Sequence, residues 1–175
     1  MFKFFSIIFP VFILVLISCN DNPRQVNMAK VKNSEMKKPL LKANRGLVIK
    51  ENEEIDAYVR RRNWQMQNTG SGLRYRFYKN GTGDLAQAGN YAFINYKITL
   101  LDGSECYRTK DKPERFLIDQ DNVESGLHEG IKLMRVGDKA IFILPPHLAH
   151  GLIGDQEKIP PLATIIYDVE LVSIK

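Results

Sequence analysis

The stretch Ser125–Leu144, SGLHEGIKLMRVGDKAIFIL, changes its hydrophobic period halfway along. In its first half Leu127, Ile131 and Met134 recur at helical spacing, and Gly137 follows as a stop signal. The second half, KAIFIL, is a short apolar run that is typical of a strand. This stretch therefore predicts one short amphipathic helix that is followed directly by a strand.

Further strands are indicated on both sides of this stretch by alternating apolar side chains. Two of these runs end at turn signals, Asn80-Gly81 and Asp102-Gly103, and the second pair is a strong hairpin signal. A short strand is also predicted at 115–118. The alternating positions are Leu73, Tyr75 and Phe77; Ala92, Ile94, Tyr96, Ile98 and Leu100; and Ile165, Tyr167, Val169 and Leu171. An antiparallel sheet packed on one helix makes the predicted fold class α+β.

The first twenty residues, MFKFFSIIFPVFILVLISCN, have the layout of a secretory signal peptide, with the early cation Lys3 and then an apolar run. This run is too short for a membrane-spanning helix, which needs about 20 apolar residues. Leu16-Ile17-Ser18-Cys19 resembles the bacterial lipobox, in which the cysteine is lipidated after cleavage. We therefore expect residues 1–18 to be a lipoprotein signal peptide. Lipidated Cys19 would anchor the protein to a membrane of the cell envelope, facing the periplasm or the cell surface.

The positive charge of the chain, formally +5, is not spread evenly. Residues 24–62 hold 11 Lys and Arg against 5 Asp and Glu, whereas residues 70–175 hold 13 against 14. A domain without excess positive charge argues against nucleic-acid binding. Residues 19–45 are polar and basic without sustained periodicity, which predicts a flexible, lipid-anchored tether. Two interpretations of this basic stretch stay open, contact with an anionic lipid surface and a solvated tether.

Residues 46–69 are predicted to form a short docking helix and a connector. Ile55, Tyr58, Val59 and Arg62 follow helical spacing, with acidic residues at the start and arginines at the end, as the helix dipole favours. The helix is too short to build an extensive dimerisation coiled coil. We therefore expect it to dock on the following domain, and we expect a monomer.

Motifs for phosphate binding, dinucleotide binding, serine hydrolysis and CxxC chemistry are absent from the sequence. His147 and His150 stand three residues apart, but with only His128 remaining and no paired cysteine, no metal site and no cofactor are expected. With Cys19 lipidated, Cys106 lacks a disulfide partner within the chain. A nucleophilic Cys106 would need a nearby base and an electropositive site. Nothing in the sequence identifies either, so a semi-buried or edge thiol is the expectation.

Two long segments carry a family pattern. GLHEGIKLMRVGDKAIFILPPHLAHG, residues 126–151, and IPPLATIIYDVELVSI, residues 159–174, resemble the C-terminal half of the FKBP-type peptidyl-prolyl cis-trans isomerases. NYKITLLDG, residues 95–103, is similar to the strand and turn that precede the active-site edge of that family. The matching positions are Gly126, Glu129, Gly130, Met134, Gly137, Lys139, Pro145, Ala149, Gly151, Ile159, Pro160, Ala163, Tyr167, Asp168, Val169, Glu170 and Leu171.

The resemblance covers about residues 70–175 and implies a peptidyl-prolyl isomerase domain, in which an antiparallel sheet curves around one short amphipathic helix. Its partners would be proline-containing polypeptides. The implied pocket for the prolyl ring is lined by Tyr96, Val123, Leu127, Ile159 and Tyr167. Each of these side chains alone would also suit an ordinary core; together they match the pocket of the family.

Five positions depart from the family pattern. Where the family usually has Phe-Asp after the Asp-Gly turn, this chain has Cys106 and Tyr107. The tyrosine of the A-Y-G loop is His150, whose ring N–H is also a hydrogen-bond donor. Leu127 replaces a tryptophan at the floor of the pocket. The valine-isoleucine pair whose backbone contacts ligand is Val123-Glu124, and a backbone N–H is available there whatever the side chain.

This chemistry needs neither a nucleophile nor a metal. Rotation about the X-Pro bond meets a barrier of roughly 18–20 kcal/mol, because resonance gives the amide double-bond character. An apolar pocket that desolvates the amide and holds its twisted form more tightly than the planar forms would lower this barrier. A lost charge-assisted hydrogen bond at the altered positions would cost about 1.5–3 kcal/mol, or roughly ten- to a hundredfold in rate.

The sequence therefore predicts an isomerase that assists the folding of exported cell-envelope proteins. Signal peptide, basic tether and domain together, including the run YVRRRNW, resemble the FKBP lipoproteins associated with gliding motility. Two alternatives stay open. One is a catalytically weak or inactive proline-binding chaperone or interaction module, and the other is a structural lipoprotein inside an envelope assembly.

Overall fold

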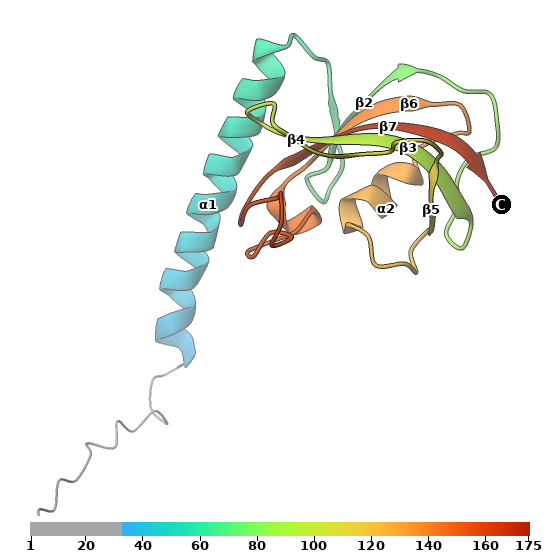
Figure 1. Ribbon diagram of the computed structural model, residues 1–175. Helices are drawn as coiled ribbons and strands as arrows, with labels where there is room; N and C mark the ends of the chain where they lie inside the picture. The colour runs from blue at the N-terminus through green and yellow to red at the C-terminus, as the bar shows by residue number, and fades with distance from the viewer. Residues whose placement is uncertain (1–32) are drawn as a thin grey trace, which may run out of the picture. The chain divides into compact units, whose positions relative to one another are not determined.

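The computed structural model describes the backbone from Asn33 to Lys175 and the side chains from Leu41 onward, except that of Ala43. The predicted signal peptide, Cys19 and the first part of the tether lie outside these residues. Residues Leu41–Lys175 form one compact unit. Its elements and the helix leading into it are α1 (Asn33–Arg61), β1 (Gln67–Asn68), β2 (Arg74–Lys79), β3 (Tyr91–Leu100), β4 (Glu105–Arg108), β5 (Glu114–Leu117), α2 (Ser125–Ile131), β6 (Lys139–Leu144), η2 (Pro146–Leu148) and β7 (Ile165–Ile174) (Figure 1).

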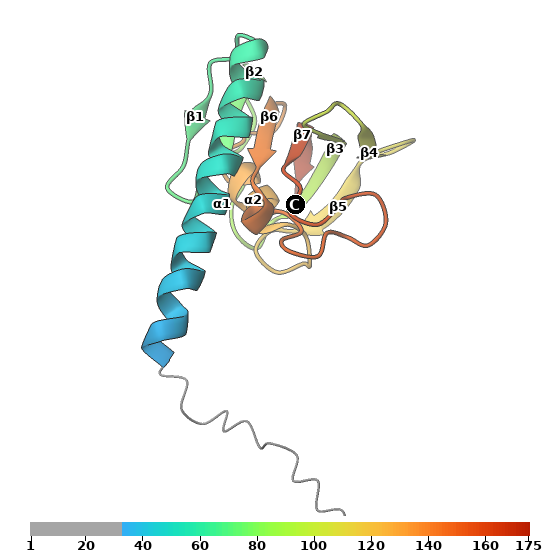
Figure 2. The same cartoon turned by 90° about the vertical axis from the view of Figure 1, so that its left-hand side faces the viewer.

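All strand pairs are antiparallel, and the strands follow the order β1-β2-β6-β7-β3-β4, with β5 also paired to β3. The long strand β7 therefore lies between β6 and β3, although it is the last strand along the chain. The sheet curves around α2, as the two ribbon views show (Figures 1 and 2). This arrangement confirms the predicted α+β class and the strands expected from the alternating patterns.

The inner face of the sheet and α2 enclose the main core. Leu127 and Ile131 of α2 and the following Met134 are buried against strand side chains such as Phe142 and Leu144. The remaining core residues are mainly the predicted alternating positions, among them Leu73, Ala92, Ile94, Ile98, Ile165, Tyr167, Val169 and Leu171. Most of this core is aliphatic, so hydrophobic burial is its main source of stability.

Two glycines let α2 approach β6 closely. A Cβ atom on Gly130 would lie 2.5 Å from ring carbon Cε2 of Phe142, and one on Gly126 would lie 2.6 Å from Cγ of Leu144. Both positions belong to the family pattern in the sequence. Their role in this structure is to leave room for the strand side chains beneath the helix.

Helix α2 is shorter than the sequence predicted. It ends at Ile131 rather than near Gly137, and Lys132 is its C-cap. The chain then continues in tighter turns, because the N–H groups of Leu133 and Met134 donate to the carbonyls three residues earlier. Met134 still reaches the core, which explains why its helical spacing extended the prediction too far.

The opposite, outer face of the sheet is covered by the C-terminal part of α1. Ile55 and Tyr58 are buried there against Ile141, Ile143 and Ile166 of strands β6 and β7. The helical spacing of Ile55 and Tyr58 thus corresponds to a docked face.

A buried arginine joins this same contact. The Arg74 guanidinium, whose side chain is only 9% exposed, pairs with Asp56 and also donates to Asn52 at 3.0 Å. Both partners lie on α1, so the helix satisfies the one strongly buried cation of strand β2.

Helix α1 begins earlier than the sequence predicted. It starts at Asn33, so residues 33–45 are helical where a tether was expected. The physical reason is local: residues 33–45 contain three lysines and two leucines, which have high helix propensity, and the helix accommodates Pro39. Within residues 33–175, no helix combines the length and the apolar character needed to cross a membrane.

The hairpin predicted at Asp102-Gly103 joins β3 to β4, and Gly103 adopts a positive φ of 94° in the turn. Its register contains a bulge: Ile98 pairs with Tyr107 and Thr99 pairs with Glu105. Cys106 is therefore the extra residue on β4. A bulge changes the direction of the side chains beside it, which matters for the site described next.

Candidate functional site

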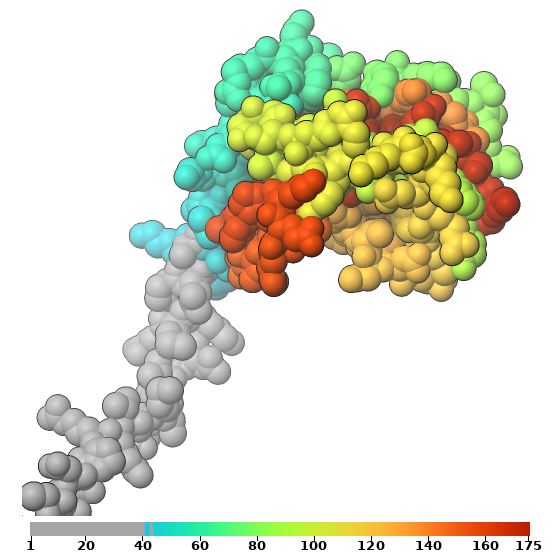
Figure 3. All heavy atoms as spheres, viewed as in Figure 1, coloured from blue at the N-terminus to red at the C-terminus, as the bar shows by residue number. Residues whose placement is uncertain are grey.

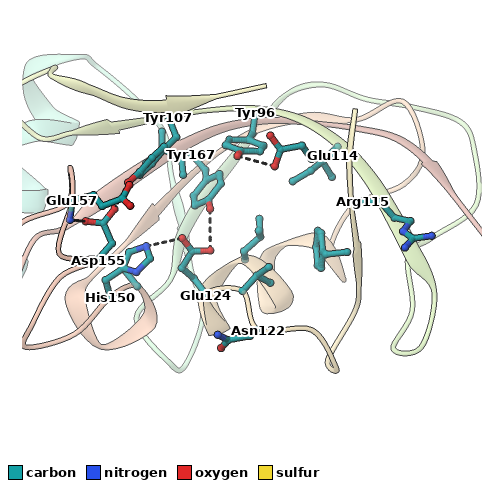
Figure 4. Close-up of a pocket in the computed structure, with 16 residues that line it drawn as sticks. Tyr96, Tyr107, Glu114, Arg115, Asn122, Glu124, His150, Asp155, Glu157 and Tyr167 are labelled. Atoms are coloured by element: carbon teal, nitrogen blue, oxygen red, sulfur yellow. Dashed lines mark hydrogen bonds and ion pairs between the residues drawn. The ribbon is translucent and has the colours of Figure 1, made fainter. Parts of the chain in front are cut away.

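A pocket of about 490 Å³ opens on the inner side of the sheet (Figure 4). It lies between strands β3, β4, β5 and β7, the start of α2 and the loop 149–163. The loop and the β4 region form neighbouring parts of the surface (Figure 3) and are joined by hydrogen bonds. The lining residues are Ile94, Tyr96, Ile98, Tyr107, Glu114, Arg115, Phe116, Asn122, Val123, Glu124, Leu127, Ala149, His150, Asp155, Glu157 and Tyr167.

Two tyrosines on neighbouring strands form the aromatic wall of the pocket. The ring centroids of Tyr96 on β3 and Tyr167 on β7 are 5.7 Å apart, with an interplanar angle of 52°. Their strands are paired, and the alternation within each strand turns both rings toward the inner face. Ile94, Phe116 and Leu127 supply an apolar floor. This part of the pocket combines an apolar floor with an aromatic wall, which suits a compact apolar ring.

The side chain of Glu124 lies inside the pocket. Only 10% of it is exposed, and its two carboxylate oxygens are engaged separately: Tyr167 Oη donates to Oε2 at 3.0 Å, and His150 Nε2 lies 2.9 Å from Oε1. Figure 4 shows this chain of contacts crossing the pocket. Burial, and then the nearby Glu124 charge, raise the pKa of Tyr167 well above its usual value. Tyr167 is therefore a protonated donor at every physiological pH.

A second tyrosine–carboxylate contact lies at the β5 side of the pocket. Tyr96 Oη donates to Glu114 Oε2 at 3.0 Å. Burial is the main cause that raises the pKa of Tyr96, and the hydrogen bond to Glu114 adds to it. Glu114 itself is exposed, so its carboxylate is available to solvent at the rim.

The β4 side of the pocket is built around Tyr107. Its hydroxyl donates to Asp155 and, at 3.2 Å, to Glu157 Oε2, both from the loop that follows η2. Asp155 Oδ1 also accepts the backbone N–H groups of Glu157 at 2.9 Å and Ile159 at 2.7 Å. Burial opposes ionisation of Asp155, but these hydrogen bonds outweigh it and lower its pKa to about 2. Tyr107 thus holds the loop against β4 through a carboxylate that is charged at neutral pH.

The structure brings together seven of the nine residues that the sequence predicted for the site. Tyr96, Tyr107, Val123, Glu124, Leu127, His150 and Tyr167 all line the pocket. Their individual catalytic roles stay predictions. The contribution of Glu124 is larger than the sequence indicated, because its side chain enters the pocket as well as its backbone.

Cys106 does not line the pocket, which corrects the prediction for this residue. The β4 bulge turns its side chain into the core, where it is 4% exposed and its Sγ lies 3.6 Å from the Lys158 carbonyl oxygen. Burial, followed by the charge of Asp155, raises the pKa of this thiol. Cys106 is therefore a protonated thiol that is more deeply buried than the sequence predicted, and its surroundings do not favour a nucleophile.

Ile159 also lies behind the pocket rather than on its wall. Its side chain is 2% exposed and belongs to the main core, while its backbone N–H holds Asp155. Its place in the site is therefore indirect. The conformation of the loop 149–163 sets the orientation of the Ile159 side chain, and the sequence alone does not predict that conformation.

Glu114, Asp155 and Glu157 are the acidic lining residues that the sequence did not predict. Glu114 comes from β5 and the other two from the loop 149–163, so only the tertiary fold brings them to one pocket. The single usable signal was the buried-looking tyrosine at position 107, whose hydroxyl needs a partner.

The histidines are engaged in separate contacts. His147 Nε2 lies 2.9 Å from the Ser71 carbonyl oxygen, whereas His150 contacts Glu124. Within the part of the chain that the structure describes, no three His, Cys, Asp or Glu side chains are grouped so that they could hold a metal ion.

The comparisons with known proteins agree with this geometry. The family model for FKBP-type peptidyl-prolyl cis-trans isomerases matches residues 83–172. The isomerase FkpA of Escherichia coli K12 is 34% identical over 110 residues, which are 63% of this chain and 40% of FkpA. FkpA of Aeromonas hydrophila is 37% identical over 110 residues, 63% of this chain and 41% of that protein. This chain thus matches about two fifths of the length of these curated relatives.

Solved structures show the same fold. The crystal structure of Escherichia coli FkpA superposes with a TM-score of 0.64 and 27% identity, covering 83% of this chain and 74% of that one. A peptidyl-prolyl isomerase from Pseudomonas syringae superposes with a TM-score of 0.65 at 20% identity, covering 75% and 95%, and supports the fold alone. The family and the fold that the sequence predicted are both confirmed.

Proposed function

This chain belongs to the family of FKBP-type peptidyl-prolyl cis-trans isomerases, and on that premise we propose that it accelerates cis-trans isomerisation of X-Pro bonds in the pocket at Tyr96 and Tyr167. The observation that carries the proposal is the packed tyrosine pair over an apolar floor, at the positions where the family resemblance puts the pocket. A prolyl ring is a compact apolar group of the kind that such a cavity takes.

The pocket would act by binding the twisted amide more tightly than the planar forms. Removing the X-Pro amide from water disfavours its charge-separated resonance form, which lowers the barrier to rotation. Tyr96 and Tyr167 would hold the prolyl ring while the preceding residue rotates. The Glu124 backbone N–H, at the N-cap of α2, would hold a substrate carbonyl. Contacts that form best in the twisted state raise the rate.

The β4 side of the site departs from the family pattern, and we expect this to lower the rate. Tyr107 replaces the usual acidic residue, and its hydroxyl is already hydrogen-bonded to Asp155 and Glu157. If one charge-assisted hydrogen bond to the substrate is lost, the rate falls by roughly ten- to a hundredfold. The enzyme would then be a modest isomerase.

The direct test is prolyl exchange measured with purified residues 20–175 on short X-Pro peptides. Acceleration that Tyr167→Ala and Tyr96→Ala remove would support the site. Tyr78→Ala is the matched control, because Tyr78 lies on β2, is exposed, and does not line this pocket. Equal losses in all three folded variants would contradict the assignment of the pocket.

A second function, proline binding without efficient turnover, is favoured by one observation. The Glu124 carboxylate lies inside the pocket beside the tyrosine pair, and only 10% of its side chain is exposed. A polar group there would weaken desolvation of the amide while leaving room to bind a polypeptide. Peptide binding without any acceleration of exchange would establish this chaperone or interaction role and replace the isomerase.

The cellular setting is a separate part of the proposal. The signal-peptide pattern and the lipobox-like sequence at Cys19 support a lipid-anchored protein of the cell envelope that acts, as a monomer, on exported proteins. The overall resemblance to gliding-motility lipoproteins suggests clients in a motility apparatus. Cys19→Ala should abolish labelling by palmitate in cells, and retained labelling would reject the lipid anchor. A purely structural lipoprotein would instead tolerate Tyr96→Ala and Tyr167→Ala without any cellular defect.

A further inference from the structure

Carboxylates outnumber basic groups around the pocket. Its lining includes four acidic side chains, Glu114, Glu124, Asp155 and Glu157, against Arg115 and His150. The domain as a whole has nearly balanced charge, with 13 Lys and Arg against 14 Asp and Glu in residues 70–175. The negative charge is therefore concentrated at the site rather than shared by the whole surface.

The two basic lining residues leave this charge largely uncompensated. His150 contacts Glu124, deep in the pocket. The Arg115 guanidinium lies over the Tyr91 ring, 4.7 Å from its centroid, and Figure 4 shows it away from the tyrosines and carboxylates that line the pocket. One further cation, Lys158, stands outside the lining: its Nζ is 4.9 Å from the Tyr107 centroid and donates to the Cys106 carbonyl oxygen at 2.9 Å.

Two of the carboxylates are placed to meet a bound polypeptide. Glu114 and Glu157 are both exposed, and each accepts a tyrosine hydroxyl through Oε2, from Tyr96 and Tyr107 respectively. Figure 4 shows them on opposite sides of Tyr167. The tyrosine hydroxyls orient the carboxylates at the rim, while the partly exposed ring of Tyr96 adds a face that attracts a cation.

We propose that this site prefers X-Pro segments in which a lysine or arginine stands next to the proline, because Glu114 and Glu157 flank the pocket that takes the prolyl ring. The inference rests on the proposed function, since it assumes that proline occupies the pocket. Glu124 is excluded as a selector, because both of its oxygens are already engaged within the protein. The rim carboxylates thus select the neighbouring residue and the tyrosine pair binds the proline.

The expected preference is modest and depends on salt. Exposed ion pairs are weak, so kcat/KM for a Lys-Pro peptide should exceed that for the matching Glu-Pro peptide by about three- to tenfold at low ionic strength. The ratio should approach one at about 1 M salt, where the Debye length is about 3 Å, against about 30 Å at 0.01 M.

The test uses the full chain and four peptides, Ala-Lys-Pro-Phe, Ala-Leu-Pro-Phe, Ala-Glu-Pro-Phe and Ala-Leu-Pro-Lys. Prolyl exchange and peptide binding are both measured, at about 0.01 M and about 1 M ionic strength. The fourth peptide shows whether the cation acts before or after the proline. Glu114→Gln and Glu157→Gln should each lower the Lys-Pro to Glu-Pro ratio about two- to threefold. Glu114→Lys should reverse the preference.

Glu53→Gln is the matched control, since it makes the same charge change at an exposed position of α1 that does not line the pocket. It should leave the ratio within about 1.5-fold of the unmodified chain. A ratio below about two for the unmodified chain, or an equal drop in the control, overturns the inference.

The outcomes also separate this inference from the proposed function. Acceleration of all peptides without a charge preference removes the selectivity and leaves the isomerase in place. Binding that prefers Lys-Pro without any acceleration removes the isomerase and leaves the selectivity. If no peptide is bound or turned over, both proposals fall.

Discussion

The two faces of the sheet are covered by helices in different ways. On the inner face, α2 packs against a large, mostly aliphatic core, and the pocket opens beside it. On the outer face, α1 contributes Ile55 and Tyr58 to a much smaller cluster and adds polar contacts to Arg74. The inner face therefore carries both the main core and the pocket, whereas the helix on the outer face contributes no residue to the pocket.

The residues of the pocket differ in how firmly the fold holds them. Tyr96 and Tyr167 stand on paired strands whose other side chains fill the inner core, so their separation is set by the sheet itself. The rim residues Asp155 and Glu157 come from a loop and rely on individual hydrogen bonds to Tyr107. We expect changes to the inner face to affect the whole domain and changes to the outer face to remain local.

The largest effect is expected from Phe142→Ala. Phe142 is fully buried between β6 and α2, so its loss should lower the free energy of unfolding by about 3–5 kcal/mol. Urea unfolding followed by fluorescence measures the change. Val172→Ala, at a position 37% exposed on β7, is the control and should cost under about 0.5 kcal/mol. Similar losses of unfolding free energy in both variants would show that the inner core is not the main source of stability.

Ile55→Ala tests the outer face. Removing this buried side chain should cost about 2–4 kcal/mol, yet α1 should loosen without loss of the pocket. Hydrogen exchange should quicken in residues 50–61, while β3 and β7 stay protected and prolyl exchange activity is retained. Leu47→Ala, which alters a 43% exposed side chain of the same helix, should change neither measurement. Loss of activity in Ile55→Ala would mean that the two faces are coupled.

The loop contact at Asp155 can be tested by the pH dependence of stability. The folded pKa of Asp155, about 2, lies below the usual unfolded value of about 3.9, so its carboxylate stabilises the fold above pH 4. That contribution, about 1–2 kcal/mol for a half-buried group, should disappear as the pH falls from about 4 to about 2. Unfolding at pH 4.5 and pH 2.5 measures it, and Asp155→Asn should remove this part of the pH dependence. An unchanged pH profile in the variant would contradict the hydrogen bonds assigned to Asp155.

The smallest effect is expected inside the pocket. Tyr167→Phe removes the donor to Glu124 but keeps the ring, so the free energy of unfolding should fall by about 0.5–1.5 kcal/mol. A double-mutant cycle with Glu124→Gln measures how much of this change belongs to the contact. A second cycle with His150→Ala measures the contact between His150 and the other carboxylate oxygen of Glu124. Strictly additive effects of Tyr167→Phe and Glu124→Gln would show that the contact does not contribute.

Much of the inner face could be predicted from the sequence, because alternation within a strand is a local property. The positions 92–100 and 165–171 alternate, and the Asp102-Gly103 turn joins two strands, so Tyr96 and Tyr167 could be placed on inward faces. The family resemblance then placed both residues in one pocket. The structure and the comparisons confirm this fold and this family.

The parts that could not be predicted depend on contacts between distant segments. The acidic rim combines Glu114 with Asp155, and no local pattern brings β5 to the loop after η2. The direction of Cys106 depends on a bulge that is defined by the partner strand. The end of α2 at Ile131 could not be predicted, because the turns that follow keep Met134 in the core at a helical spacing from Ile131.

The position of β7 in the sheet has a consequence for how the domain is formed. This strand is the last one along the chain, but it pairs with both β3 and β6 in the middle of the sheet. The earlier strands on either side therefore have no common partner until residues 165–174 are present. Such long-range pairing makes folding slow relative to that of helical domains of similar size. The domain should accordingly remain unfolded until these residues have been synthesised and then fold in one late, cooperative step.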